Sequence, residues 1–343
     1  MVRVLEALDF LALPHVLLDV RSPGEHAHGH VPGAINFPLF DDAERARVGT
    51  LYKQVGRDAA VLEGLRIVGP RMAELVERAR SLSANGPVRV YCWRGGERSG
   101  SMAWLLDKAG LPGVFVLRGG YKAFRRHVLG SFPGPASLRV LGGCTGSGKT
   151  ETLGLLKDAG AQVVDLEALA RHKGSAFGGL GEAPQPTTEH FENRLWAALQ
   201  ALNTAEPVWV EDESLMIGRV KLPPAFYAAL RSAPLWFVDM PLDDRLGRLV
   251  ADYGHFPQEA LAASVERIGK RLGPQHCKAA LEALSVGDLH AVARITLSYY
   301  DRAYRKGMAA RDQARVQHVP ARAHDLRDLV YRLLANTPPA DHG

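Results

Sequence analysis

Short apolar runs alternate with longer segments of helical periodicity along this chain. In its first part the runs HVLLDVRS (15–22), VRVYC (88–92) and GVFVLRGG (113–120) are typical of buried strands. Helical patterns lie between them, as in PRMAELVERARSL (70–82) and SGSMAWLLDKAG (99–110). Strands that alternate with helices predict an α/β fold with a parallel sheet covered on both faces. Ligands of such sheets bind at the carboxyl ends of the strands.

The segment GSFPGPAS (130–137) interrupts this alternation, because two prolines and two glycines break regular structure. We therefore predict a first domain over residues 1–130, a linker over 131–137 and a second domain over 138–335. In the second domain, strands are predicted at 138–141 and within EPVWVEDES (206–214), APLWFVDMP (233–241) and RVQHVPA (315–321). A helix is expected from Glu151, and the C-terminal region is expected to be helical.

Composition limits the class of protein. Of the 343 residues, 46% are hydrophobic and 23% charged, as in soluble globular proteins. No apolar run reaches the roughly 18 residues of a membrane span, so no membrane partner is expected. Three cysteines, an odd and sparse number, favour a reducing compartment and hence a cytoplasmic location. The net charge of +5 favours anionic partners.

Cys92 stands between a predicted strand and a predicted helix, in a loop rich in glycine and arginine. Glycines let consecutive N–H groups converge on an anion, and a helix N-terminus adds positive potential. Both favour a thiolate, and Arg98 can fork two hydrogen bonds onto a tetrahedral oxyanion above the sulfur. We predict Cys92 and Arg98 as catalytic, whereas Cys144 and Cys277 are interpreted as structural. The remaining predicted loop residues are Trp93, Arg94, Gly95, Gly96, Glu97 and Ser99.

A second phosphate-binding loop is predicted in GGCTGSGKT (142–150), which follows a strand and precedes a helix. Lys149 supplies a charge, and Thr150 can reach Mg²⁺. Asp212, in the acidic end of EPVWVEDES, is the expected second metal ligand. Arg245, Arg248, Lys270 and Arg271 are interpreted either as cations of a lid or as a solvated helix face. The predicted phosphate-binding residues are Gly143, Gly146, Ser147, Gly148, Lys149 and Thr150.

The C-terminal segment 291–343 carries nine Lys or Arg against five Asp, with tyrosines at 299, 300 and 304. Cations for phosphates beside rings for stacking are typical of an RNA-binding face. We predict that Arg302, Tyr304, Arg305 and Lys306 bind RNA. An ordinary amphipathic helix with exposed arginines remains the alternative interpretation.

Several of these motifs resemble the rhodanese family. The segment LLDVRSPGEHAHGHVPGAINFP (17–38) is similar to its amino-terminal signature, YCWRGGERS (91–99) to its active-site loop and LRGGYKAF (117–124) to the following turn. The resemblance implies a loop cysteine that carries a persulfide. Five residues separate Cys92 from Arg98, whereas many rhodaneses have four. The longer loop is similar to that of phosphatases of the same fold, although Tyr91 stands where those have histidine.

A rhodanese-like domain followed by a P-loop domain, with CWRGGERS, GCTGSGKT, HKGSAFG and EDES in this order, resembles the tRNA 2-selenouridine synthase family. The resemblance implies a transferase that alkylates the wobble 2-thiouridine of tRNA with geranyl diphosphate, then replaces the geranylthio group with selenium from selenophosphate. It implies that Cys92 carries selenium as a Cys–Se adduct. Expected partners are the anticodon arm of tRNA and an enzyme that produces selenophosphate.

No prosthetic group is expected. The placement of geranyl diphosphate in the P-loop is our own inference, and a nucleotide there is the alternative. Two other functions remain open from the residues. One is a rhodanese-fold phosphatase or sulfurtransferase with a regulatory P-loop domain. The other is a P-loop kinase with a rhodanese binding module.

Overall fold

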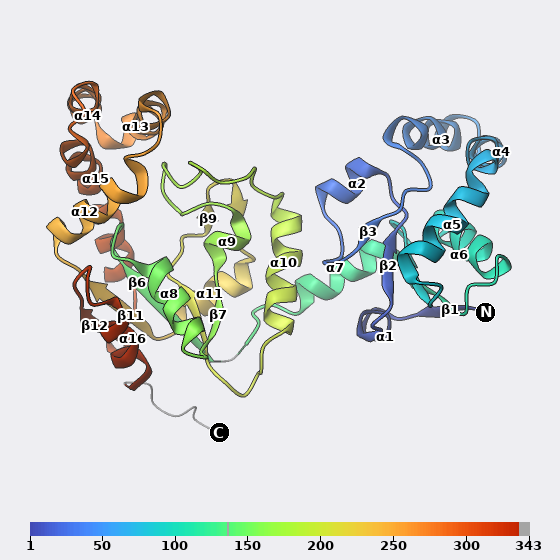
Figure 1. Ribbon diagram of the computed structural model, residues 1–343, viewed down its shortest axis with the longest axis horizontal. Coiled ribbons are helices and arrows are strands. Elements are labelled where there is room, and N and C mark those ends of the chain that lie inside the picture. Colours follow the sequence, from blue (N-terminus) through green and yellow to red (C-terminus); the bar gives the residue numbers. More distant parts are fainter. Residues whose placement is uncertain (136, 336–343) are drawn as a thin grey trace. The chain divides into compact units, whose positions relative to one another are not determined.

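The computed structural model describes residues 1–135 and 137–335, and the chain divides into two compact units, Met1–Ser131 and Phe132 onward (Figure 1). The boundary lies at the start of the predicted linker, of which Ala136 is outside the described residues. Both units have the predicted α/β architecture with a parallel sheet. Among the described residues, none of the helices combines the length and apolar character that a membrane crossing requires.

The first unit is built on a sheet in the order β1-β5-β4-β2-β3, with every strand pair parallel. Helices α5 and α6 pack together against the sheet, while α1 and α7 contact each other. The strands are β1 (Val2–Leu5), β2 (Val16–Asp19), β3 (Ile35–Asn36), β4 (Val88–Tyr91) and β5 (Val114–Leu117). The helices are α1 (Ala7–Ala12), α2 (Pro23–His28), α3 (Asp42–Gln54), α4 (Arg57–Val68), the 3₁₀ turn Gly69–Arg71, α5 (Met72–Ser83), α6 (Glu97–Lys108) and α7 (Gly120–Gly130).

The second unit has a parallel sheet in the order β12-β11-β6-β8-β7 and a separate two-stranded pair. Strand β6 is central, and all of its residues are buried. The strands are β6 (Leu138–Gly143), β7 (Gln162–Val164), β8 (Val208–Glu211), β9 (Met216–Ile217), β10 (Val220–Lys221), β11 (Leu235–Asp239) and β12 (Val316–Pro320). The helices of the sheet layer are α8 (Lys149–Asp158), α9 (Leu166–Ala170), α10 (Thr188–Gln200), α11 (Pro224–Ser232) and α16 (Leu326–Ala335).

Four further helices form a helical subdomain of the second unit, beside the sheet (Figure 1). They are α12 (Leu242–Tyr253), α13 (Gln258–Leu272), α14 (Pro274–Ser285) and α15 (Leu289–Ala309), after which the 3₁₀ turn Gln313–Arg315 leads into β12. Leu261, Val265 and Leu284 belong to a hydrophobic cluster separate from the core under the sheet. The expectation of a helical C-terminal region is confirmed.

The predicted strands all form, and the two helices that follow the candidate loops begin two residues earlier than expected. Helix α6 begins at Glu97, not Ser99, and α8 begins at Lys149, not Glu151. Both starts fall inside the loop motifs because the glycine before each helix leaves the helical conformation. Arg98 and Thr150 are therefore first-turn helical residues, next to the unpaired N–H groups of a helix start.

Candidate active sites

The first candidate site is the loop between β4 and α6, at the carboxyl edge of the first sheet. Cys92 directly follows β4, and its side chain is buried. Its sulfur lies 3.1 Å from the hydroxyl of Ser99, which also donates to the carbonyl of Gly96. This contact joins Cys92, the first residue after β4, to the first turn of α6 and so links the two ends of the loop.

Glycine is required where this loop packs against the turn before α7. A Cβ on Gly95, whose φ is +67°, would lie 2.7 Å from the carbonyl oxygen of Leu117. A Cβ on Gly120 would lie 2.3 Å from the carbonyl oxygen of Cys92. The N–H of Tyr121 donates to that same carbonyl at 2.8 Å. The close approach of two backbone segments therefore fixes the position of Cys92.

The Asp-x-Arg signature, which begins at the last residue of β2, contacts residues that adjoin this loop. Asp19 and Arg21 form a buried ion pair at 2.6 Å, and the hydroxyl of Tyr91 donates to Asp19 at 2.7 Å. The guanidinium of Arg21 lies 3.9 Å from the ring centroid of Tyr121. Burial acts against the charge of Arg21, but Asp19 outweighs it and raises the pKa of the guanidinium. Because these groups neutralise one another, the signature is structural and orients the end of β4.

Arg98 already has an anionic partner within the protein. It forms a forked pair with the carboxylate of Glu25, with distances of 2.6 and 3.2 Å. Glu25 also accepts from the backbone N–H of Ser22 at the start of α2. Burial acts to raise the pKa of Glu25, but the hydrogen bonds and charge of Arg98 lower it. Sequence reasoning missed Glu25, since only the fold brings it to a loop more than seventy residues away.

The other predicted loop residues face solvent. Trp93, Arg94, Gly96 and Glu97 are exposed, and Glu97 pairs with Arg57 at 2.7 Å. Trp93 also contacts the ring of Tyr121. These residues therefore surround the loop mouth without lining the sulfur, and their part in binding stays a prediction.

The second candidate site is a cavity of about 1790 Å³ at the mouth of the P-loop. Gly146, Ser147, Gly148, Lys149 and Thr150 all line it. The ammonium of Lys149 donates to the carbonyl of Gly143 at 3.0 Å and lies 5.3 Å from the ring centroid of Tyr304. The buried hydroxyl of Ser147 has no hydrogen-bond partner within the described part of the chain. An unsatisfied donor beside these glycines fits a loop that receives a phosphate.

Two buried carboxyl groups adjoin the P-loop. The hydroxyl of Thr150 donates to Glu167 at 3.0 Å, and Glu167 shares a hydrogen bond with Glu213. Burial and then the charge of Glu167 raise the pKa of Glu213 to about 8. Burial acts against the charge of Lys149, but Tyr304, Glu167 and Glu213 outweigh it and raise the pKa of the ammonium. Glu167 was missed from sequence, although it lies in the first turn of the helix that follows β7, three residues after the strand ends.

Asp212, the expected metal ligand, lines the same cavity but is paired with two arginines. Its carboxylate accepts hydrogen bonds from Arg231, at 3.2 Å, and from the buried Arg311. In the described residues no group of three or more His, Cys, Asp or Glu is arranged to hold a metal. Thr150 and Glu167 instead offer hard oxygen donors that suit Mg²⁺ once diphosphate oxygens and water complete the shell. A metal role for Asp212 stays a prediction that its arginine partners do not favour.

Of the four residues predicted to bind RNA, all on α15, only two line the P-loop cavity. Tyr304 and Lys306 line the P-loop cavity together with Tyr299, Tyr300 and Gly307. Arg302 and Arg305 are exposed and do not line it. A helix turns about 100° per residue, so residues 300, 304 and 307 share a face that 302 and 305 do not. Tyr304 therefore belongs to the P-loop cavity.

The four cations interpreted as a possible lid also differ in their surroundings. Arg245 is buried and bonded to Asp301 through both terminal nitrogens at 2.8 Å, so it is structural. Arg248, Lys270 and Arg271 line the cavity. Arg248 pairs with Glu151 at 2.7 Å, beside the P-loop. Three of the four cations are thus placed to meet an anion, and sequence alone did not distinguish them from the fourth.

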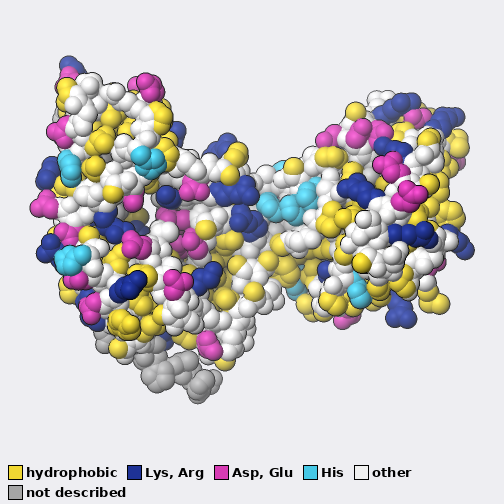
Figure 2. Space-filling view, in the orientation of Figure 1, with side chains coloured by type: hydrophobic (Ala, Val, Ile, Leu, Met, Phe, Trp, Pro, Cys, Tyr) yellow, Lys and Arg dark blue, Asp and Glu magenta, His cyan; other side chains and the backbone are white. Residues whose placement is uncertain are grey.

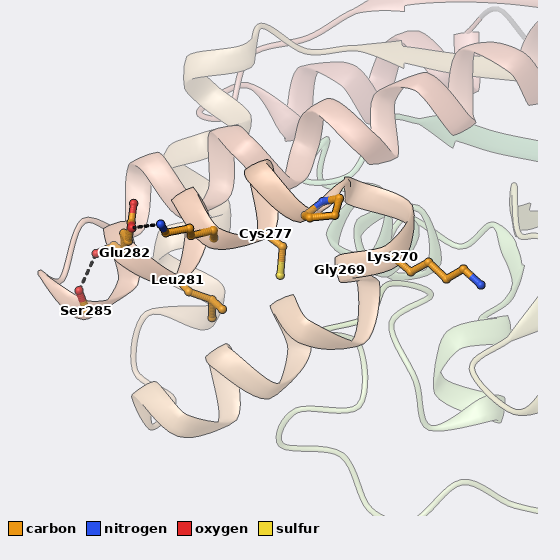
Figure 3. A pocket seen from close by; sticks show the side chains of 8 residues that line it. Gly269, Lys270, Cys277, Leu281, Glu282 and Ser285 are labelled. Carbon is orange, nitrogen blue, oxygen red and sulfur yellow. Dashed lines mark hydrogen bonds and ion pairs between the residues drawn. The ribbon is translucent and has the colours of Figure 1, made fainter.

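A smaller cavity of about 670 Å³ lies between α13 and α14 (Figure 3). Its walls include Cys277 and Leu281, and the sulfur of Cys277 points into the gap between the two helices. Lys270 extends away from Cys277 in this view. The interpretation of Cys277 as a structural residue is compatible with its place between two packed helices.

The comparisons with known proteins cover both units. Residues 4–127 match the rhodanese-like domain, and residues 136–324 match the AAA domain of tRNA 2-selenouridine synthase. A tRNA 2-selenouridine synthase from Bdellovibrio bacteriovorus is 43% identical over 69% of this chain and 64% of its own length. One from Nitrosomonas eutropha is 41% identical over 69% of this chain and 62% of its own length.

A further synthase of that name, from Shewanella loihica, is 40% identical over 77% of this chain and 70% of its own length. With the first two relatives, the match spans just under two thirds of their own length. The order of the two domains agrees with these matches. The chain belongs to the tRNA 2-selenouridine synthase family.

Proposed function

We propose that this protein replaces the sulfur of wobble 2-thiouridine in tRNA with selenium, through an S-geranylated intermediate. The observation that carries the proposal is the composition of the P-loop cavity. Its phosphate-binding loop adjoins apolar and aromatic side chains, among them Leu249, Ile268, Tyr253 and Tyr300. A nucleotide needs phosphate and base contacts, whereas geranyl diphosphate needs a cationic cradle next to an apolar wall. The apolar side chains beside the cationic loop support the second combination.

In the first step the sulfur of 2-thiouridine attacks carbon 1 of geranyl diphosphate. The carbon–sulfur bond forms, the carbon–oxygen bond breaks, diphosphate leaves and the base loses its N3 proton. Negative charge grows on the departing diphosphate, so a preorganised cation there lowers the barrier. Lys149, which the surrounding acidic groups keep protonated, supplies that charge.

Mg²⁺ fits the same place. Thr150 and Glu167 would hold it together with diphosphate oxygens, and the ion would neutralise the leaving group. The hydrogen bond between Thr150 and Glu167 already brings these two oxygens to 3.0 Å. Asp212 is not needed for this arrangement, because its charge is taken up by Arg231 and Arg311.

The selenium step belongs to Cys92. Its thiolate attacks the phosphorus of selenophosphate, so that a sulfur–phosphorus bond forms, the phosphorus–selenium bond breaks and hydrogenselenide leaves. Hydrogenselenide then attacks carbon 2 of the geranylated base and expels geranylthiolate, and water releases phosphate from the cysteine. A Cys–Se adduct would instead require a two-electron oxidant, because selenium in selenophosphate is at the level of selenide. The five-residue loop suits a tetrahedral phosphoryl group.

The test is mass spectrometry of a thiolated tRNA incubated first with geranyl diphosphate and then with selenophosphate. We expect the wobble nucleoside to gain one geranyl group and then to exchange geranylthio for selenium. Failure to gain the geranyl group in the first incubation, with tRNA bound, would contradict the P-loop assignment. Phosphate release from selenophosphate without any tRNA product would instead favour the phosphatase alternative.

A further inference from the structure

The P-loop cavity is larger than one small substrate requires. Its volume is about 1790 Å³, whereas sites for single small ligands usually measure about 300–1,000 Å³. Geranyl diphosphate is within that range, so a second occupant fits beside it. The proposed chemistry requires one, because the thiocarbonyl sulfur must reach the carbon that bears the diphosphate.

The cavity is lined by more basic than acidic side chains, and only some of the basic ones are paired. Its lining includes ten Lys or Arg and six Asp or Glu. Among the acids, Glu151 pairs with Arg248, Asp212 with Arg231, and Glu182 lies 3.9 Å from Lys173. Glu167 and Glu213 share a hydrogen bond with each other. Most of the acidic lining is therefore already partnered.

Four of the lining cations have neither an ion pair nor a side-chain hydrogen bond within the described part of the chain, and all four are exposed. They come from separate elements: the turn between β9 and β10, helix α13 and helix α15. They are Arg219, Lys270, Arg271 and Lys306. Figure 2 shows dark blue side chains gathered around the hollow beside the helical subdomain. We call these four residues the cavity rim.

We propose that the cavity rim binds the phosphate backbone of tRNA and so delivers the wobble base to the P-loop. This inference rests on the proposed function, since it takes tRNA as the substrate. Exposed, unpaired cations at the mouth of the site proposed to bind a diphosphate suit a polyanion that enters the same site. Arg302 and Arg305 are also exposed cations, but they face away from the cavity, where a bound backbone would not position the base.

The experiment measures the salt dependence of binding to a 2-thiouridine-bearing anticodon stem-loop, by fluorescence anisotropy. The rim variant is Arg219→Gln/Lys270→Gln/Arg271→Gln. The matched control is Arg302→Gln/Arg305→Gln/Arg327→Gln, which also loses three exposed cations but none of the cavity lining. Each lost phosphate contact lowers the log–log slope by roughly 0.7–0.9, so the rim variant should lose about 2 to 3 from the slope. The control should keep the slope of the unmodified protein.

Several outcomes separate this inference from the proposed function. If the unmodified protein binds the stem-loop and the rim variant keeps its slope, the inference is wrong while the function stands. A slope lowered only in the control would place the RNA on exposed cations outside the cavity, on α15 or α16. No binding by the unmodified protein at all would overturn both. The three single rim variants, each measured for thermal unfolding and for geranyl diphosphate binding, guard against a folding defect in the triple variant.

Discussion

The guanidinium of Arg98 donates hydrogen bonds from both terminal nitrogens to the carboxylate of Glu25, at 2.6 and 3.2 Å. The two hydrogen bonds that Arg98 was expected to donate to a substrate oxyanion are therefore donated to a carboxylate of the protein itself. Any phosphoryl group that binds above Cys92 through Arg98 must compete with Glu25. We therefore expect the ion pair to weaken the binding of anions at this loop.

Substitution Glu25→Gln should tighten phosphate binding at this loop. An ion pair that is partly exposed contributes about 1 kcal/mol or less, so the dissociation constant should fall by up to about fivefold. Binding is measured as the protection of Cys92 from alkylation by iodoacetamide at rising phosphate, read on the Cys92 peptide. Glu44→Gln is the matched control, because Glu44 also caps a helix of this unit and pairs with an arginine, Arg71. Equal protection in both variants would show that Glu25 does not compete.

The Glu25–Arg98 pair also predicts a pH dependence of stability. Arg98 lowers the pKa of Glu25. A carboxyl group with a lowered pKa stabilises the fold above its unfolded pKa and loses this contribution as the pH falls through its folded pKa. The free energy of unfolding should therefore differ between the unmodified protein and Glu25→Gln at neutral pH, and the difference should shrink below about pH 4. Urea titrations at both pH values measure it, and a difference that grows in acid would contradict the ion pair.

Substitution Cys92→Ala should abolish selenation and spare geranylation. The selenium step needs a thiolate to cleave selenophosphate, while alkylation uses the sulfur of the tRNA itself as nucleophile. Mass spectrometry of the wobble nucleoside separates the two steps, and Cys277→Ala is the control that removes a thiol of the other unit. Conversion of geranylated tRNA to the selenium product at an unchanged rate by Cys92→Ala would exclude the role of Cys92.

Substitution Lys149→Ala should slow geranylation by about 10²–10³-fold, the usual loss when one preorganised charge at a developing anion is removed. Selenation of tRNA that is already geranylated should continue, because it does not release diphosphate. Rates of both steps are followed on isolated nucleosides. Normal alkylation combined with a loss of ATP binding would show that the P-loop is a nucleotide site.

Substitution Asp212→Asn should destabilise the second unit rather than block chemistry. It would leave the buried guanidinium of Arg311 without a charge partner, and breaking such a pair costs about 3–5 kcal/mol. Urea unfolding measures the loss. The double variant Asp212→Asn/Arg311→Met should recover much of it, since the buried charge is then absent. An unchanged stability with lost Mg²⁺ dependence would return Asp212 to its expected role as a metal ligand.

Sequence determined the strands, both glycine-rich loops and the identity of their central residues. The spacing of apolar residues and the residues that favour turns are local features of a sequence. The run VRVYC, which ends at Cys92, and the pattern around Lys149 therefore each predicted a strand, a loop and a helix. Their predicted functions followed from residue types that few other structures require together: a thiol among glycines, and a lysine and threonine after a glycine loop.

Only the tertiary structure decided the partners of those residues. Glu25 reaches Arg98 and Glu167 reaches Thr150 because parallel strands bring distant loops to one edge of each sheet. Tyr304 and Arg305 are neighbours in sequence, yet the turn of α15 puts one in the P-loop cavity and leaves the other outside it. Residue types alone do not distinguish the two positions, because the direction of each side chain depends on which face of α15 packs against the neighbouring helices α12, α13 and α14.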